Sequence, residues 1–232
     1  MGAPSGDRRP VSETRMSDPL TSLDAILAPT RSALLVVDLQ NDFIHPRGWT
    51  ARHHPEAPSL RAVIPPINRL METARAAGVP VGYVLMEHGP AVDLPNYRAR
   101  YAARGMDGEL LCAAGTWGAA LDAEVTPPAP DDLVVLRHSY DAFAGTPLHQ
   151  RLRERGVETV VGTGVVTNLC VQTTVQHAFA LGYYVVVAED GTATTDATVQ
   201  SVTLANFRQF FGPVVSSETI ARHWRPSTPA PA

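Results

Sequence analysis

The stretch VVGTGVVTNLCVQTTVQHAFALG, residues 160–182, runs from an apolar segment through two glycines into a predicted helix. Its apolar start has the pattern of a strand that is buried on both faces of a parallel sheet. Cys170, one of only two cysteines in the chain, lies near the start of the predicted helix. A buried strand that leads directly into a helix is typical of α/β proteins, in which strands and helices alternate along the chain.

Short apolar runs alternate with amphipathic stretches along the chain. The runs predict strands over residues 32–39, 79–86, 132–137, 158–164 and 183–190, with a short edge strand within 213–217. Helical spacing predicts helices over 59–78, 146–156 and 195–212, and a short helix or turn over 115–125. We expect long loops over 45–58 and 87–114. This order predicts a mostly parallel sheet that is covered by helices on both faces.

Two predicted helices carry informative prolines and caps. Pro65 and Pro66 indicate either a kink in the helix over 59–78 or a helix that starts there. Thr146 is the expected N-cap of the helix over 146–156, with Pro147 in its first turn and Gly156 at its end.

The composition is that of a globular protein, with 44% hydrophobic and 18% charged residues among 232. Residues 30–224 are expected to form one domain, with a flexible extension over 1–29 and a tail over 225–232; Met1 and Met16 are both open as the translation start. A net charge of −4 argues against nucleic acid and anionic membranes as partners, and no apolar run is long enough for a membrane helix. Two cysteines make a reduced, cytoplasmic protein the expectation.

Three chemically useful residues lie at or just after predicted strand ends: Asp38, Arg137 and Cys170. Open α/β sheets bind ligands at the carboxyl ends of their strands. Separately, Asp38 could cap a turn, Arg137 could be a solvated cation, and Cys170 could fill a gap in the core. Together they supply a base, a fixed positive charge and a sulfur nucleophile, which are the parts of thiol-dependent hydrolysis.

Four segments resemble the isochorismatase-like cysteine hydrolase superfamily over about residues 30–220: LLVVDLQNDF, CAAGTWGAAL, YDAFAGTPLHQRL and VVGTGVVTNLCVQTTVQHAFALGYYVVVAEDGTAT. Within it, the sequence is most similar to the amidases and ureido hydrolases, such as carbamoylsarcosine amidases and ureidoacrylate amidohydrolases. The resemblance implies a three-layer αβα sandwich, which is Rossmann-like, and an enzyme that is assembled as a dimer or tetramer.

The resemblance also implies residue roles. Asp38 matches the catalytic aspartate and Cys170 the nucleophile, whereas Arg137 stands where the family has a lysine. The chain contains no lysine at all. The backbone N–H groups of Val166 and Cys170 would form the oxyanion hole, and a cis peptide bond would join Val165 to Val166.

The expected reaction is hydrolysis of a C–N bond in a small amide, carbamoyl or ureido compound through a thioester. Arg137 keeps the lysine's positive charge, and its planar fork could bind Asp38 bidentately. Thr167 and Asn168 are expected to cap the helix of Cys170. Candidate substrate contacts are Gln40, Asn41, Phe43, Trp117, Tyr140 and Phe143.

No cofactor and no metal are expected. Nicotinamidases of the superfamily bind a metal through an aspartate and closely spaced histidines, whereas the loop after residue 86 offers only His88, and His53 and His54 lie in another loop. Two alternatives remain open: an isochorismate-type vinyl-ether hydrolase, which would not need Cys170, and a catalytically degenerate binding protein in which Arg137 has replaced the lysine.

Overall fold

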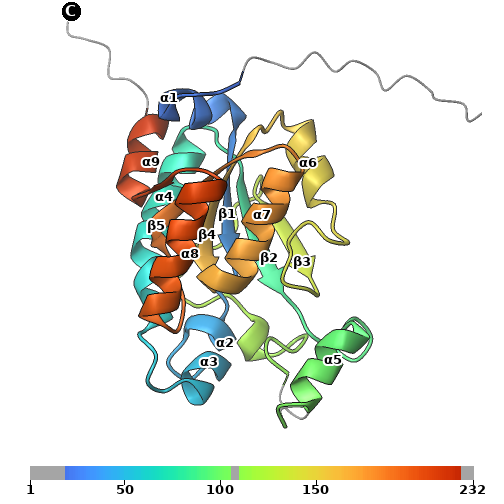
Figure 1. Cartoon of the computed structure of the whole chain (residues 1–232). Coiled ribbons are helices and arrows are strands. Elements are labelled where there is room, and N and C mark those ends of the chain that lie inside the picture. The colour runs from blue at the N-terminus through green and yellow to red at the C-terminus, as the bar shows by residue number, and fades with distance from the viewer. Residues whose placement is uncertain (1–18, 106–109, 226–232) are drawn as a thin grey trace, which may run out of the picture.

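Six parallel strands form the central sheet of the computed structural model, which describes residues 19–105 and 110–225 (Figure 1). Their order across the sheet is β3-β2-β1-β4-β5-β6. All five neighbouring pairs run parallel. The bounds are β1 (Ser32–Val37), β2 (Val81–Met86), β3 (Leu133–Arg137), β4 (Thr159–Val165), β5 (Tyr184–Ala193) and β6 (Val214–Val215). The predicted strands are confirmed, including the short edge strand.

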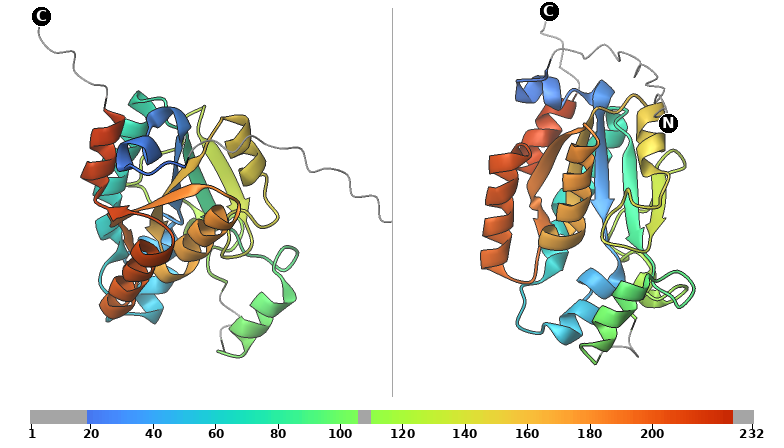
Figure 2. Two further views of the ribbon diagram at one scale, coloured as in Figure 1. Left: turned by 45° about the horizontal axis from the view of Figure 1, so that its top comes forward. Right: turned by 45° about the vertical axis from the view of Figure 1, so that its right-hand side comes forward.

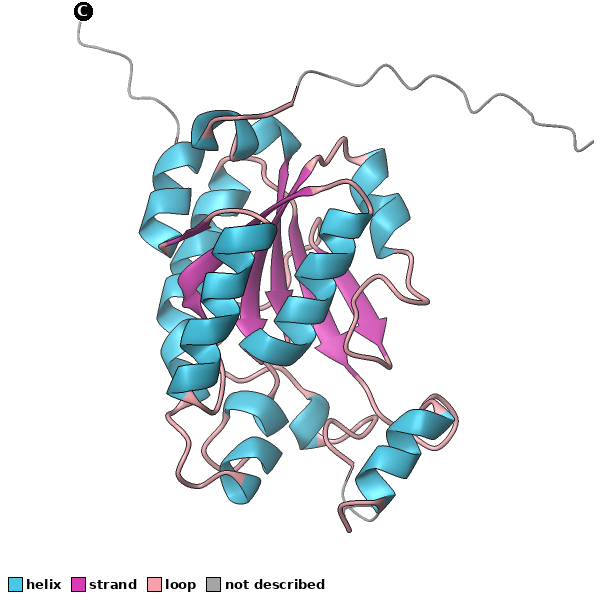
Figure 3. Ribbon diagram, in the orientation of Figure 1, coloured by secondary structure: helices cyan, strands magenta, loops and turns pink. Residues whose placement is uncertain are grey.

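Helices cover both faces of the sheet, which confirms the three-layer α/β fold (Figures 1 and 3). Helices α4 and α9 pack on one face, and α7 and α8 on the other. Of the helices described, none has the length and apolar character that a bilayer span requires. The bounds are α1 (Leu23–Ile26), α2 (Asn41–Ile44), α3 (Trp49–His53), α4 (Ile64–Ala76), α5 (Pro95–Ala102), α6 (Leu148–Glu154), α7 (Gln172–Ala180), α8 (Ala197–Phe210) and α9 (Ser217–Trp224).

The burial pattern explains the strand order. Every residue of β1 and of β4 is buried, as expected for strands with neighbours on both sides and helices on both faces. In β3, which lies at the edge, buried and exposed residues alternate, and Val134 and Leu136 face solvent. The continuous apolar runs of the sequence therefore mark the middle of the sheet.

The structure shows where the two proline-containing helices begin. A 3-10 turn over Leu60–Val63 precedes α4, which starts at Ile64 with a proline at its first positions, so the helix starts at the proline pair. The N-cap prediction for the helix over 146–156 was wrong by one residue. Pro147 is the N-cap of α6, and Thr146 is the residue before it, where its hydroxyl bonds the carbonyl of Ala142 at 2.5 Å.

Three expectations about loops and ends need correction. Both predicted long loops contain a helix, α3 within 45–58 and α5 within 87–114, because short helices with few aliphatic residues give little hydrophobic periodicity. The segment 115–125, predicted as a short helix or turn, holds a 3-10 turn over Trp117–Ala119, which agrees with that prediction.

The expected flexible extension over 1–29 is wrong for residues 23–29. These residues form α1 and a turn. Leu27 is buried in the core, and its carbonyl accepts a hydrogen bond from Nε1 of Trp224 in α9. Residues 1–18 of the extension and residues 226–232 of the tail lie outside the described residues.

The carboxyl ends of the strands point toward α2, α3 and α5 (Figure 2). The two ends of the described chain, α1 and α9, lie at the opposite edge of the sheet (Figures 1 and 2). The helices at the carboxyl edge therefore surround the place where the sequence predicts the site.

Candidate active site

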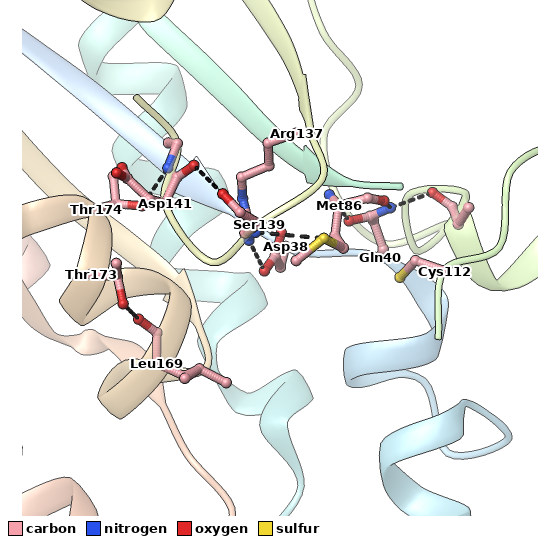
Figure 4. Close-up of polar contacts among 12 residues, drawn as sticks. Asp38, Gln40, Met86, Cys112, Arg137, Ser139, Asp141, Leu169, Thr173 and Thr174 are labelled. Atoms are coloured by element: carbon pink, nitrogen blue, oxygen red, sulfur yellow. Dashed lines mark hydrogen bonds and ion pairs between the residues drawn. The ribbon is translucent and has the colours of Figure 1, made fainter. Parts of the chain in front are cut away.

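Three strand ends bring the predicted residues together. Asp38 directly follows β1, Arg137 is the last residue of β3, and Cys170 lies in a π-helical turn over Thr167–Val171 that follows β4. Strand β2 separates β1 from β3, and Met86 at its end is the register partner of Arg137. The long arginine side chain crosses under β2 and donates to the Met86 sulfur at 3.6 Å on its way to Asp38 (Figure 4).

Arg137 uses its two terminal nitrogens for different partners. Its Nη2 donates to Oδ2 of Asp38, and its Nη1 donates to the carbonyl oxygen of Ser139 (Figure 4). The other carboxylate oxygen of Asp38, Oδ1, has no hydrogen-bond partner among the described residues. The bidentate pairing that the sequence left open is thus absent, and Asp38 keeps one oxygen for another proton donor.

Burial sets the protonation of the site. Desolvation raises the pKa of Asp38 above its ordinary value, although Arg137 and the Cys170 thiol both oppose this shift. Desolvation also raises the pKa of the Cys170 thiol to about 12, against the opposing charge of Arg137. Desolvation disfavours the charge on Arg137, but Asp38, Cys170 and Tyr97 together outweigh it and raise the pKa of Arg137, so it is a permanent cation. The resting site therefore holds a neutral thiol next to a carboxyl group of enhanced basicity.

Backbone geometry around Cys170 matches one expectation and contradicts another. The peptide bond between Val165 and Val166 is cis, as the resemblance implies. The predicted capping by Thr167 and Asn168 is wrong, since no side chain caps this turn or α7. Asn168 instead accepts a hydrogen bond from Thr194 at 2.6 Å, which ties the turn to the end of β5.

A cavity of about 430 Å³ opens onto Cys170, a size that suits a small molecule. Val166 and Cys170 form part of its floor together with Met86. Its walls are rich in aromatic rings, contributed by Phe43, Trp49, Tyr97, Tyr101 and Tyr140. Polar groups around it include His54, Arg100, Arg104, Asn168, Thr194 and Asp196.

Two of the six predicted substrate contacts, Phe43 and Tyr140, line this cavity, and two others hold loops together instead. The Gln40 amide donates to the carbonyls of Met86 and Ala119, both at 2.7 Å, and accepts from the Met86 N–H at 2.8 Å. The Asn41 amide donates to the carbonyl of Trp117 at 2.8 Å. Gln40 and Asn41 are therefore structural, because backbone groups occupy their amides.

The other two predicted substrate contacts that need correction are the aromatic residues Trp117 and Phe143. Trp117 lies outside the cavity lining, is 47% exposed and packs its ring against the guanidinium of Arg47. Phe143 is buried away from the cavity, against His177 and Tyr183. Neither position could be deduced from the local sequence, because both are set by how distant segments pack.

Sequence reasoning missed the contribution of α3 and α5. Trp49 comes from α3, and Tyr97, Arg100, Tyr101 and Arg104 come from α5 or its end. The spacing of these last four residues is that of one helical face, and this was the signal that could have identified them.

The histidines that could be metal ligands contact different residues and do not face one another as a ligand set. His88 is buried and bonds Asp93 at 2.6 Å, whereas the His53 ring stacks on Trp49. Within residues 19–105 and 110–225, no group of three or more His, Cys, Asp or Glu side chains is placed to hold a metal ion. The expectation of a metal-free enzyme stays a prediction.

The fold is a parallel three-layer α/β sandwich in which Cys170 lines the cavity and the paired Asp38 and Arg137 are buried outside its lining. The chain belongs to the isochorismatase family, because the model of the isochorismatase domain matches residues 32–219.

Similar proteins indicate which class of reaction this chain catalyses. The ureidoacrylate amidohydrolase RutB of Klebsiella variicola is 35% identical over 217 residues, which cover 87% of this chain and 90% of that protein. A cysteine hydrolase from Pseudomonas syringae superposes with a TM-score of 0.78 at 29% identity, covering 90% of this chain and 98% of that one. N-carbamoylsarcosine amidase from Thermoplasma acidophilum does so with a TM-score of 0.65 at 32% identity, covering 80% and 95%. The chain is accordingly a hydrolase that acts on non-peptide C–N bonds.

Proposed function

We propose that this enzyme hydrolyses the C–N bond of a small amide, carbamoyl or ureido compound through a thioester on Cys170. Asp38 would be the acid–base group and Arg137 the fixed charge. The observation that carries the proposal is that the buried pair of Asp38 and Arg137 interacts with Cys170, which in turn lines the cavity. The substrates of the amidohydrolase relatives, a ureido and a carbamoyl compound by name, support this substrate class.

In the first half of the reaction, the Cys170 sulfur attacks the substrate carbonyl carbon while its proton moves to Asp38. A buried carboxylate with a raised pKa is a stronger base than an exposed one, which favours this transfer. The tetrahedral adduct collapses when Asp38 returns the proton to the leaving nitrogen. The C–N bond breaks, the amine or ammonia departs, and the acyl group stays on sulfur as a thioester.

In the second half, water attacks the thioester while Asp38 takes its proton. The C–S bond then breaks, and Asp38 returns that proton to the sulfur, so the thiol and carboxylate are regenerated. The oxyanion in both adducts would accept hydrogen bonds from the N–H groups of Val166 and Cys170, and both residues line the cavity. Arg137 would keep its charge throughout and hold Asp38 in place.

The proposal includes a homo-oligomer in the cytoplasm that takes a small molecule as its substrate partner. Large apolar side chains are exposed on α7 and α8, namely Phe179, Val202 and Phe210, and this supports a subunit contact there. Both cysteines are free, and a reducing compartment would keep the Cys170 thiol available.

The test is an ammonia-release screen over amide, carbamoyl and ureido compounds, combined with intact-mass detection of acid-quenched enzyme. We expect a Cys170-linked acyl adduct with the best substrate, and a loss of kcat of about 10³-fold or more in Cys170→Ala. Cys112→Ser is the matched control, because Cys112 is the other buried cysteine and is absent from the cavity lining. Unchanged ammonia release in Cys170→Ala would overturn the thioester route, because the C–N bond would then be cleaved without the thiol.

A further inference from the structure

One face of α5 contributes charge as well as aromatic surface to the cavity of Cys170. Tyr97, Arg100, Tyr101 and Arg104 all line this cavity. Two guanidinium groups therefore border the same space as the thiol, although neither belongs to the catalytic residues proposed above.

Aromatic rings hold the Arg100 guanidinium at the cavity wall. Its central carbon lies 5.9 Å from the ring centroid of Tyr101 and 5.9 Å from that of Tyr140, and both rings line the cavity. The Tyr140 ring in turn packs at 4.9 Å from Tyr97. Contacts of a cation with two aromatic rings restrain the side chain, so Arg100, although exposed, is held next to the cavity.

The charges around the cavity do not balance. Among the described residues that line the cavity, Asp196 is the one carboxylate, and it accepts the N–H of Val199 at 2.9 Å as the N-cap of α8. Asp38 is already paired with Arg137. The ion pairs found within the described residues engage other arginines and do not include Arg100 or Arg104. The described residues that line the cavity thus carry excess positive charge, on a chain whose net charge is −4.

We propose that the substrate is an anion that carries a carboxylate at the end remote from the reacting carbonyl, and that Arg100 binds this carboxylate. Arg104, one helical turn further on, would add to the positive potential. The guanidinium fork matches a carboxylate in geometry as well as in charge. This inference rests on the proposed function, because it places the carbonyl at Cys170.

The first test compares matched substrates. Ureido acids with one to three methylene groups between nitrogen and carboxylate are each paired with the alkylurea in which a methyl group replaces the carboxylate. We expect kcat/KM to favour one of the acids by about tenfold or more. Arg100→Gln is expected to remove most of this preference, because it raises KM for the acid much more than KM for the alkylurea.

Arg98→Gln is the matched control, because Arg98 is also an exposed arginine on α5 but is absent from the lining of this cavity. It should leave both members of the pair unchanged. Equal hydrolysis of acid and alkylurea, or a preference that survives Arg100→Gln, would overturn the inference and leave the proposed function intact.

A second test does not depend on turnover. Iodoacetate and iodoacetamide alkylate the same thiol and differ only in a carboxylate, so the ratio of their rates at Cys170 reports the charge at the cavity. We expect Arg100→Gln to lower this ratio severalfold, because it removes one cation, and Arg98→Gln to leave it unchanged. A lowered ratio without any ammonia release would retain the anion site and refute the proposed function. An unaltered ratio, or no labelling of Cys170 by either reagent, would overturn the anion site.

Discussion

Arg137 does more at its position than supply a charge. It bonds Asp38 through one nitrogen and the carbonyl of Ser139 through the other, and it contacts the sulfur of Met86 between them. These three contacts fix the loop after β3, the end of β2 and the proposed base relative to one another. A lysine has a single terminal nitrogen and could not make the same set of contacts from the same backbone position.

The pairing of Asp38 with Arg137 at a buried site predicts a specific pH dependence of kcat/KM. Asp38 must be ionised to accept the thiol proton, so kcat/KM should fall as the pH falls through its folded-state pKa. Burial raises that pKa, so the midpoint of the acid limb should lie above the ordinary value of 3.8. The Cys170 thiol, with its pKa raised to about 12, should add no ionisation at neutral pH.

Variants of Arg137 provide the control for this pH profile. Arg137→Met removes the nearest cation and should move the midpoint up by about one unit or more, with a lower rate, whereas Arg137→Lys should leave it near the wild-type position. The measurement is kcat/KM from ammonia release over the acid range in all three proteins. A midpoint that stays in place in Arg137→Met would show that the guanidinium does not act on Asp38.

At the scale of single residues, the sequence was informative where one rule decides the position. Asp38, Arg137 and Cys170 could be predicted to converge, because the carboxyl ends of parallel strands meet at one edge. Gln40, Asn41, Trp117 and Phe143 could not be placed, because their surroundings come from distant loops. The roles of the three converging residues are the proposal, whereas their convergence is a property of the structure.

At the scale of elements, the strands were predictable and the short helices were not. A buried parallel strand is a continuous apolar run, and residues 32–37 and 159–165 are recognisable as such. Helix α5 is built from PNYRARYA, in which the residues facing the cavity are aromatic or charged, so aliphatic periodicity is missing. The sequence predicts an ordinary helix around Cys170, whereas the structure has a π-helical turn there. No sequence pattern in this segment indicates such a turn.

Gly164 links β4 to the site and leads to a prediction about an element. It is the register partner of Val37, the residue before Asp38, and it has a φ of +102°. A Cβ at this position would overlap the backbone of Val37. We expect Gly164→Ala to lower the free energy of unfolding by about 2–4 kcal/mol and to reduce kcat by displacing Asp38.

Gly156→Ala is the matched control for Gly164→Ala. Gly156 also has a positive φ, of +69°, but no atom lies within 4 Å of its added Cβ. It should cost only about 1–2 kcal/mol, the penalty for an L-residue in a left-handed conformation, and leave kcat unchanged. Denaturant unfolding and steady-state kinetics of both variants test this. Equal effects of the two substitutions would show that the close approach of β4 to Val37 is unimportant.

At the scale of the whole molecule, the two edges of the sheet have different tasks. The carboxyl edge holds the cavity and the helices α2, α3 and α5 around it, whereas α1 and α9 close the amino edge (Figure 2). Trp224 of α9 is 1% exposed, and its Nε1 donates to the carbonyl of Leu27 at 3.0 Å. This one side chain therefore joins two segments that are 197 residues apart in the chain.

The separation of the two edges predicts that Trp224 affects stability but not catalysis, and that Trp117 affects neither. Trp224→Ala should lower the free energy of unfolding by about 3–5 kcal/mol, because it leaves a large cavity and an unpaired carbonyl at Leu27, while the folded protein keeps its kcat. Trp117→Ala should change the free energy of unfolding by less than about 0.5 kcal/mol and leave KM unchanged, because its ring is 47% exposed and outside the cavity lining. Denaturant unfolding and steady-state kinetics of both variants measure these effects. A raised KM in Trp117→Ala would place the substrate beyond the cavity of Cys170, on the turn that carries Trp117.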